Sequence, residues 1–338
     1  MRIRSDEEAV VLRDAASALE GADRVVLAVS GGLDSMVLLH AVAAVRVTRP
    51  KNILVATFDH CSGSHSAAAA RFVQRQAHIL GIKCVAGRAT ESLSKEHEWR
   101  EARWNFLRFI AEGFGGPVAT AHTLDDQIET VFMRILRDAG PRGLAGLYAE
   151  SEVLRPLLNL RRSELAQYAS ASGVRFMDDP SNQSRAHLRN RVRHELLPAI
   201  SKVRPAFSAD LLSIAKASAG WRGAMSQAVE RIGSPAGDGS LRVARGDLAG
   251  YDAESLRTLW PAIAAKAGVV MDRRGTHRLA EFTMKGHTGS SIQLSGGIEV
   301  RMFRDHLLIQ RWDARRVEMI RKSRLGPVTA RAWARAET

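Results

Sequence analysis

Residues 24–42 read RVVLAVSGGLDSMVLLHAV: an apolar run, a polar turn with two glycines, and a second apolar run. The first run, VVLAV (25–29), is typical of a strand buried on both faces, and residues 35–45 are predicted to form a helix. A glycine-rich turn from a parallel strand into a helix is a ready anion site, because free backbone N–H groups and the positive end of the helix dipole converge there.

The turn itself, SGGLDS, fits neither of two common phosphate-binding patterns. GxxxxGK(S/T) needs a lysine after its last glycine, and GxGxxG needs glycines that this segment lacks. An aspartate facing a polyphosphate makes electrostatic sense through a bridging Mg²⁺, so Asp34 is the expected metal ligand. The alternative is a tight turn in which Asp34 only favours the helix dipole. The expected anion site comprises Ser30, Gly31, Gly32, Leu33, Asp34 and Ser35.

Short β-branched runs alternate with helical segments as far as residue 137. Further strands are expected at 53–58, 82–86 and 117–121, and helices at 66–80, within 98–112 and at 124–137. This alternation predicts an α/β domain with a doubly wound parallel sheet and helices on both faces.

Composition indicates the kind of partner and the cellular compartment to expect. The chain has 338 residues, enough for two domains, and 49 Lys and Arg against 36 Asp and Glu give it a net charge of +13. Such an excess favours a polyanionic partner, with nucleic acid ahead of a membrane. No run of 18 apolar residues or secretory signal is seen, so a cytoplasmic protein is expected. The two cysteines, Cys61 and Cys84, form no CxxC pair and indicate reduced thiols.

Beyond residue 140 the alternation stops. Residues 155–204 carry ten basic side chains against four acids, residues 206–232 look like a helical connector, and Gly296-Gly297 indicates a hairpin turn between alternating strands. We therefore expect a first domain over 1–205, a helical linker over 206–232, a small α+β domain over 233–312 and a basic tail over 313–338.

A second polar cluster begins at the end of another predicted strand, where residues 120–130 read TAHTLDDQIET. Asp125 and Glu129 are four apart and share a helix face, and Asp126 and His122 lie close by. Like charges at this spacing repel each other, and a cation within reach would offset the repulsion. Acids that merely favour the helix dipole are the alternative.

The SGGLDS turn resembles the PP-loop of the N-type ATP pyrophosphatases, which split ATP into AMP and pyrophosphate. Residues 120–147, LRPLLNLRRSELAQYA (154–169), DDPSNQSRAHLRNRVRHELLPAI (178–200) and EWREARWNFL (98–107) are similar to the lysidine synthetase family within that superfamily. The likeness covers residues 24–200 and is weaker over 206–312. It departs at Asp59-His60-Cys61-Ser62-Gly63, where the family usually has a glycine turn, and at Thr123, where a histidine or asparagine is common.

The resemblance implies ATP and Mg²⁺ as cofactors and three substrates or partners: ATP, free L-lysine and an isoleucine tRNA with a CAU anticodon. In the family, the 2-oxygen of the wobble cytidine attacks the α-phosphate of ATP, and the ε-amine of lysine then displaces AMP. The site residues implied are the six of the SGGLDS turn for ATP; Asp34, Arg103, His122 and Asp125 for catalysis; Asp125, Asp126 and Glu129 for lysine, or for the metal; and Arg185, Arg189, Arg191 and Arg193 for tRNA. The C-terminal domain and tail would bind tRNA. The resemblance leaves open whether the protein forms a homodimer.

Two other functions fit parts of the same sequence. A tRNA thiolase shares the PP-loop and the basic charge, but its sulfur chemistry relies on suitably placed cysteines, and Cys61 and Cys84 are poor candidates by spacing. A non-catalytic RNA-binding protein could keep an ATP fold. The intact SGGLDS and DDQIET motifs argue against it.

Overall fold

The computed structural model of the protein describes residues 6–45, 52–61, 63–89, 96–178, 185, 188–236 and 239–311. The expected basic tail and the Asp-Pro-Ser-Asn stretch at 179–182 lie outside these residues. The chain divides into two compact units, Met1–Asp138 with Leu144–Lys216, and Ala139–Gly143 with Ala217–Thr338. The division falls inside helix α9 (Phe207–Ala228), so the expected limits of the domains and linker stay predictions. Within the described ranges, no helix has the length and apolar character needed to cross a membrane.

The first unit is built on a parallel four-stranded sheet in the order β3-β2-β1-β4. Its strands are β1 (Arg24–Ala28), β2 (Asn52–Asp59), β3 (Lys83–Arg88) and β4 (Val118–Ala119). The central strand β1 pairs with β2 through Val26↔Leu54 and with β4 through Leu27↔Ala119. All four predicted strands are present, although β4 has two residues and not the five expected.

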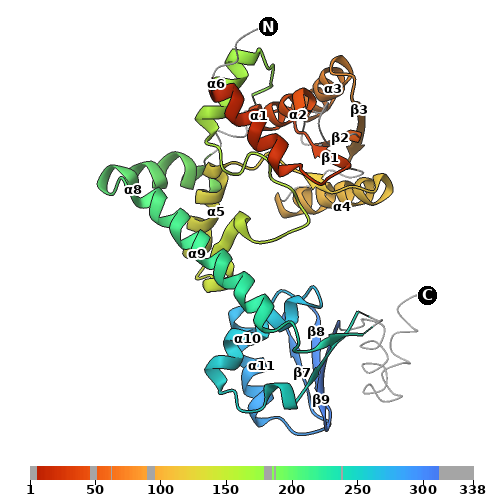
Figure 1. The fold of residues 1–338 in the computed structure, drawn as a ribbon, viewed down its shortest axis with the longest axis vertical. Coiled ribbons are helices and arrows are strands. Elements are labelled where there is room, and N and C mark those ends of the chain that lie inside the picture. Colours follow the sequence, from red (N-terminus) through yellow and green to blue (C-terminus); the bar gives the residue numbers. More distant parts are fainter. Residues whose placement is uncertain are drawn as a thin grey trace, which may run out of the picture. The chain divides into compact units, whose positions relative to one another are not determined.

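Alternate side chains of β1 point to opposite faces, and each face has its own apolar core. Val25 and Leu27 pack with α1 (Asp6–Ala18), α2 (Leu33–Val45) and α3 (Ser64–Ile79), whereas Val26 packs with α4 (Glu96–Phe114). Figure 1 shows α2 and α3 on one side of the strands and α4 on the other. The doubly wound α/β fold predicted from the alternation is confirmed.

Helices after β4 complete this unit. α5 (Leu124–Leu136) packs through Ile128 and Phe132 on the start of α9 and on the segment formed by α7 (Leu188–Arg191), a π-helical turn (Val192–Leu196) and α8 (Leu197–Val203). α6 (Arg162–Ser172) instead packs on α1 and α2. The start of α5 therefore lies between two segments that follow it in the chain.

The second unit holds an antiparallel five-stranded sheet in the order β5-β6-β9-β8-β7. The strands are β5 (Ser234–Pro235), β6 (Leu241–Ala244), β7 (Ser291–Leu294), β8 (Ile298–Met302) and β9 (His306–Arg311), and the helices are α10 (Ala253–Ala265) and α11 (Arg273–Lys285). Leu294 pairs with Ile298 around a turn in which both Gly296 and Gly297 have positive φ, so the predicted hairpin is confirmed. The unit has the small α+β architecture expected.

Candidate active site

The two polar motifs follow neighbouring strands at the point where the sheet changes direction. The chain runs from β1 outward to β3 and then crosses to β4 on the other side of β1. In open α/β sheets, ligands bind outside the carboxyl ends of the strands at such a switch point. The SGGLDS turn follows β1 and the TAHTLDD stretch follows β4, so the fold brings both motifs to one edge.

The SGGLDS turn is shaped from inside by one of its own serines. Ser35 Oγ accepts hydrogen bonds from the backbone N–H of Ser30 (3.2 Å) and Gly31 (3.1 Å) and donates to the carbonyl of Gly32 (2.9 Å). Gly31 has φ +96°, a conformation that any residue with a Cβ adopts only under strain. Leu33 is buried in the core, so only its backbone can face a ligand.

The start of α5 is fixed by a reciprocal cap. Thr123 is the N-cap: its Oγ1 accepts from the N–H of Asp126 (3.3 Å), while Asp126 Oδ2 accepts from the N–H of Thr123 (2.9 Å). A buried threonine in this position orients the helix start and one carboxylate together.

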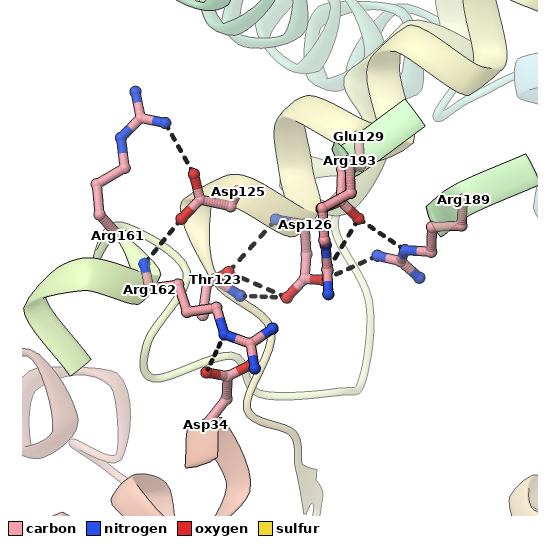
Figure 2. Close-up of polar contacts among 9 residues, drawn as sticks. All are labelled: Asp34, Thr123, Asp125, Asp126, Glu129, Arg161, Arg162, Arg189 and Arg193. Carbon is pink, nitrogen blue, oxygen red and sulfur yellow. Dashed lines mark hydrogen bonds and ion pairs between the residues drawn. The ribbon is translucent and has the colours of Figure 1, made fainter. Parts of the chain in front are cut away.

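The other oxygen of Asp126 and the whole carboxylate of Glu129 are bound by two arginines from the basic segment (Figure 2). Arg189 donates from Nε to Glu129 (2.8 Å) and from Nη2 to Asp126 (2.9 Å). Arg193 donates from Nε and Nη2 to the two oxygens of Glu129 (2.5 and 3.1 Å). Glu129 is only 2% exposed, so these two arginines replace water as the partners of its carboxylate. Burial acts to raise the pKa of Asp126, but Arg189 and the N–H of Thr123 leave it below its ordinary value.

The structure therefore splits the four arginines assigned to tRNA into two pairs. Arg189 and Arg193 point inward to the acids of α5. Arg185 and Arg191 instead lie 3.3 and 4.0 Å from Glu195, with side chains 80% and 54% exposed. Only the second pair is free to meet a phosphate backbone without giving up a buried partner.

Asp125 joins the starts of two helices. Its Oδ1 accepts from Arg161 Nη1 (3.0 Å) and its Oδ2 accepts from the backbone N–H of Arg162 (2.7 Å), which is the first residue of α6. Both arginines lie in the quoted LRPLLNLRRSELAQYA motif, yet nothing in their spacing could reveal a partner about 36 residues away along the chain. They are the site residues that sequence reasoning missed.

Asp34 lies opposite Arg162, whose Nε is 3.7 Å from Asp34 Oδ1. That oxygen is buried and makes no hydrogen bond with any described group. Burial raises the pKa of Asp34 against the opposing effect of Arg162. No group of three or more His, Cys, Asp and Glu side chains suited to a metal occurs among the described residues. One carboxylate with a bare oxygen fits a Mg²⁺ whose remaining ligands come from phosphate and water, which is how Mg²⁺ is commonly held beside nucleotides.

His122 and Arg103 occupy a more basic side of the site. His122 Nδ1 is 2.8 Å from Thr120 Oγ1, and burial lowers the pKa of His122 to about 4, so the ring is neutral at pH 7. Burial also lowers the pKa of Arg103, and nearby Arg100 and Arg189 act in the same direction. An arginine among like charges is suited to an anionic ligand.

The turn after β2 is the other departure from the family pattern. Cys61 has φ +56°, and Asp59 Oδ1 accepts from its N–H (2.9 Å) and from Ser66 Oγ (2.6 Å). Arg88 Nε donates to Cys61 Sγ at 3.1 Å. These contacts hold Cys61 in a conformation that a side chain rarely adopts. Ser62 lies outside the described residues.

Comparison with known proteins gives the family. The family described as a PP-loop domain matches residues 7–200. The tRNA(Ile)-lysidine synthase of Novosphingobium aromaticivorans is 36% identical over 231 residues, which are 64% of this chain and 67% of that protein. Those of Geobacter sulfurreducens (37% identical; 62% of this chain, 46% of that one) and Thermosipho africanus (36% identical; 57% and 48%) are also similar. This chain spans about half the length of several of the curated relatives it matches.

Among solved structures, the U34-tRNA thiolase NcsA from Methanococcus maripaludis with its 4Fe-4S cluster is similar in fold. The TM-score is 0.52 with 16% sequence identity, over 63% of this chain and 77% of that one. At this identity the likeness concerns the fold alone. The PP-loop match covers more than half of the 338 residues, and the Novosphingobium relative is matched over two thirds of its length. The chain therefore belongs to the PP-loop family and, within it, to the family of the tRNA(Ile)-lysidine synthases.

Proposed function

We propose that the protein ligates free L-lysine to the 2-position of the wobble cytidine of an isoleucine tRNA with a CAU anticodon. The reaction would consume ATP, require bound Mg²⁺, and release AMP and pyrophosphate. The observation that carries this proposal is the meeting of the SGGLDS turn with the acids of α5 at the switch point, joined by the Asp34–Arg162–Asp125 contacts. Family membership supports the reaction, and the geometry of the site supports the choice of residues.

In the first step, the 2-oxygen of cytosine attacks the α-phosphorus of ATP and the bond to the β-phosphate oxygen breaks. The backbone and hydroxyls of Ser30, Gly31, Gly32 and Ser35 bind the departing pyrophosphate. Mg²⁺, when bound, neutralises charge on the phosphates, and Asp34 offers it one oxygen. Arg103, half-buried and repelled by neighbouring arginines, faces a phosphate. Catalysis of this kind is mostly positioning and charge neutralisation.

In the second step, the ε-amine of lysine attacks C2 of the activated base and AMP leaves. All three acids bind arginines, but the side chain of Asp125 is 35% exposed, against 14% for Asp126 and 2% for Glu129, so Asp125 is the acid most accessible to a lysine ammonium group. A histidine whose pKa is about 4 is a weak base, so His122 is poorly suited to remove the proton from lysine. His122 then serves as a neutral hydrogen-bonding group.

Binding of tRNA relies on charge. The net charge of +13 and the exposed Arg185 and Arg191 favour contacts with the phosphate backbone. The second unit and the basic tail supply further contacts in this proposal, and a single cytidine must leave its stack to reach the site. The cytoplasmic location expected from the sequence belongs to the proposal as well.

The thiolase alternative is disfavoured by the cysteines. Burial raises the pKa of Cys84 to about 11, so its thiol stays protonated and unreactive at neutral pH. Only Cys61 is left, whereas an iron–sulfur cluster is held by several thiolates. We expect a Cys61→Ser/Cys84→Ser protein to keep full lysine-transfer activity. Loss of activity in that double variant, with the fold intact, would favour sulfur chemistry.

The decisive experiment is incorporation of radiolabelled lysine into isoleucine tRNA with a CAU anticodon, with and without ATP. The expected result is labelling that requires ATP and is abolished in Asp34→Ala, while an exposed Arg175→Gln variant labels normally. ATP turnover without lysine transfer would point to another nucleophile. No tRNA-dependent ATP turnover at all would leave a non-catalytic RNA-binding protein.

A further inference from the structure

Arg162 is placed in the site by its backbone and not by its side chain. Asp125 Oδ2 accepts its N–H at 2.7 Å, Arg161 on the preceding position binds Asp125 Oδ1, and the N–H of Leu124 donates to the carbonyl of Leu160 at 2.9 Å. The turn before α6 is thus docked on the start of α5. The side chain of Arg162 therefore projects toward the SGGLDS turn, while contacts of the backbone and of Arg161 fix its position (Figure 2).

The guanidinium of Arg162 is less committed than its neighbours. Figure 2 draws four arginines, and three of them hydrogen-bond a carboxylate at 2.5 to 3.1 Å through their side chains. Arg162 Nε lies 3.7 Å from Asp34 Oδ1, beyond hydrogen-bonding distance, and the side chain is 39% exposed. A loose pair of this kind is weak and can exchange its partner at little cost.

The SGGLDS turn lacks a cation of its own. It has neither lysine nor arginine, in contrast to the GK(S/T) loop in which a lysine reaches the phosphates. The charged residue that the turn does carry, Asp34, has the same sign as a polyphosphate. A cation from elsewhere in the fold can contribute that charge beside Mg²⁺, and Arg162 approaches Asp34 to within 3.7 Å.

We propose that Arg162 is a pyrophosphate-binding residue. When nucleotide binds at the turn, its guanidinium leaves Asp34 and donates N–H groups to the β- and γ-phosphoryl oxygens. It stays protonated as the α-phosphorus–oxygen bond breaks and the electron pair passes to pyrophosphate. When the guanidinium of Arg162 moves away, Asp34 Oδ1 also becomes available to a cation. The inference rests on the proposed function only in that the reaction releases pyrophosphate.

The test measures binding of inorganic pyrophosphate to the full chain by titration calorimetry with Mg²⁺ present. Arg162→Gln should weaken binding about tenfold or more, the usual effect of losing a charge-assisted hydrogen bond. Arg162→Lys, which keeps the charge without the fork, should fall between. Arg175→Gln is the matched control, because it removes the same charge from an exposed position beyond α6 and should bind as the parent does.

Kinetics give a second readout, in which Arg162→Gln should impair the ATP dependence of the reaction and leave the KM for lysine unchanged. If Arg162→Gln is poorly folded by circular dichroism, Arg162→Met, which keeps the aliphatic stem, replaces it. Pyrophosphate affinity equal to that of the parent, or no binding by the parent at millimolar pyrophosphate, would overturn the proposal. Pyrophosphate binding that needs Arg162 in a protein that transfers no lysine would refute the proposed function and keep this inference.

Discussion

Replacing Arg193 with methionine tests whether the basic segment holds the acids of α5 in place. Arg193 donates two hydrogen bonds to Glu129, a carboxylate that is only 2% exposed, and a third to Asp126 at 3.3 Å. Removing one partner of a buried ion pair costs about 3–5 kcal/mol. Here Arg189 still binds Glu129 and Arg193 is 24% exposed, so we expect a loss of about 2–3 kcal/mol.

Differential scanning calorimetry of the full chain measures this loss in the transition of the first unit. For a unit of about 200 residues, 2–3 kcal/mol corresponds to a Tm lower by roughly 4–12 °C. Arg185→Met is the control, because Arg185 is 80% exposed and its pairing with Glu195 should contribute less than about 0.5 kcal/mol. Equal Tm shifts in the two variants would refute the reasoning. The effect on tRNA should be the reverse, since losing the exposed Arg185 reduces the salt dependence of binding by about one unit of slope.

Three further predictions follow from single contacts. Because the pKa of His122 is about 4 in the folded protein against an ordinary 6.5, the unfolded chain binds more protons between these values. Stability should therefore fall as pH drops from 6.5 to 4, and the fall should be shallower in His122→Gln, as measured by Tm against pH. Gly31→Ala should lower the free energy of unfolding by about 1–2 kcal/mol, because Gly31 has a φ of +96°. Gly220→Ala lies in the middle of α9, where an added Cβ meets nothing within 4 Å, and should raise the free energy of unfolding by up to about 1 kcal/mol. Denaturant titration measures both changes, and changes of the same sign would contradict the argument. Lys266 Nζ donates to the carbonyls of Glu230 (2.8 Å), Ile232 (2.9 Å) and Gly233 (2.7 Å), so Lys266→Met should lower the Tm of the second unit by several degrees, and an unchanged Tm would mean that these carbonyls are satisfied by water.

The fold class could be predicted because its signal is local. Strands such as VVLAV are buried on both faces and read as apolar runs, and the turn residues between strand and helix are visible at once. The length of β4 could not be predicted in the same way. Its last residue, Ala119, also forms an isolated parallel bridge with Leu154, a distant partner that the local pattern does not reveal.

The candidate site divides along the same line. The SGGLDS turn and the acids of α5 could be recognised because each motif consists of neighbouring residues in the sequence. The partners of those acids were not, since Arg161 is 36 residues from Asp125 and Arg193 is 64 from Glu129. A run of arginines predicts an exposed nucleic-acid surface, but sequence alone does not show which of them turn inward. Arg189 and Arg193 do so because a 2%-exposed carboxylate needs counter-charge more than a solvated surface needs a cation.

Charge balance in the site explains why so many arginines come from distant segments. The four acids Asp34, Asp125, Asp126 and Glu129 are matched in Figure 2 by the four arginines 161, 162, 189 and 193, so this group is neutral as a whole. A polyphosphate entering a neutral group adds several negative charges, and these demand Mg²⁺ and a cation that can change partners. Under our proposal Arg162 is that cation, because each of the other three arginines would lose a hydrogen bond to its carboxylate if it moved away. In the proposed reaction, a bound polyphosphate would make the surroundings of Asp125 more negative than before, and a lysine cation would then be attracted to a group that was neutral beforehand.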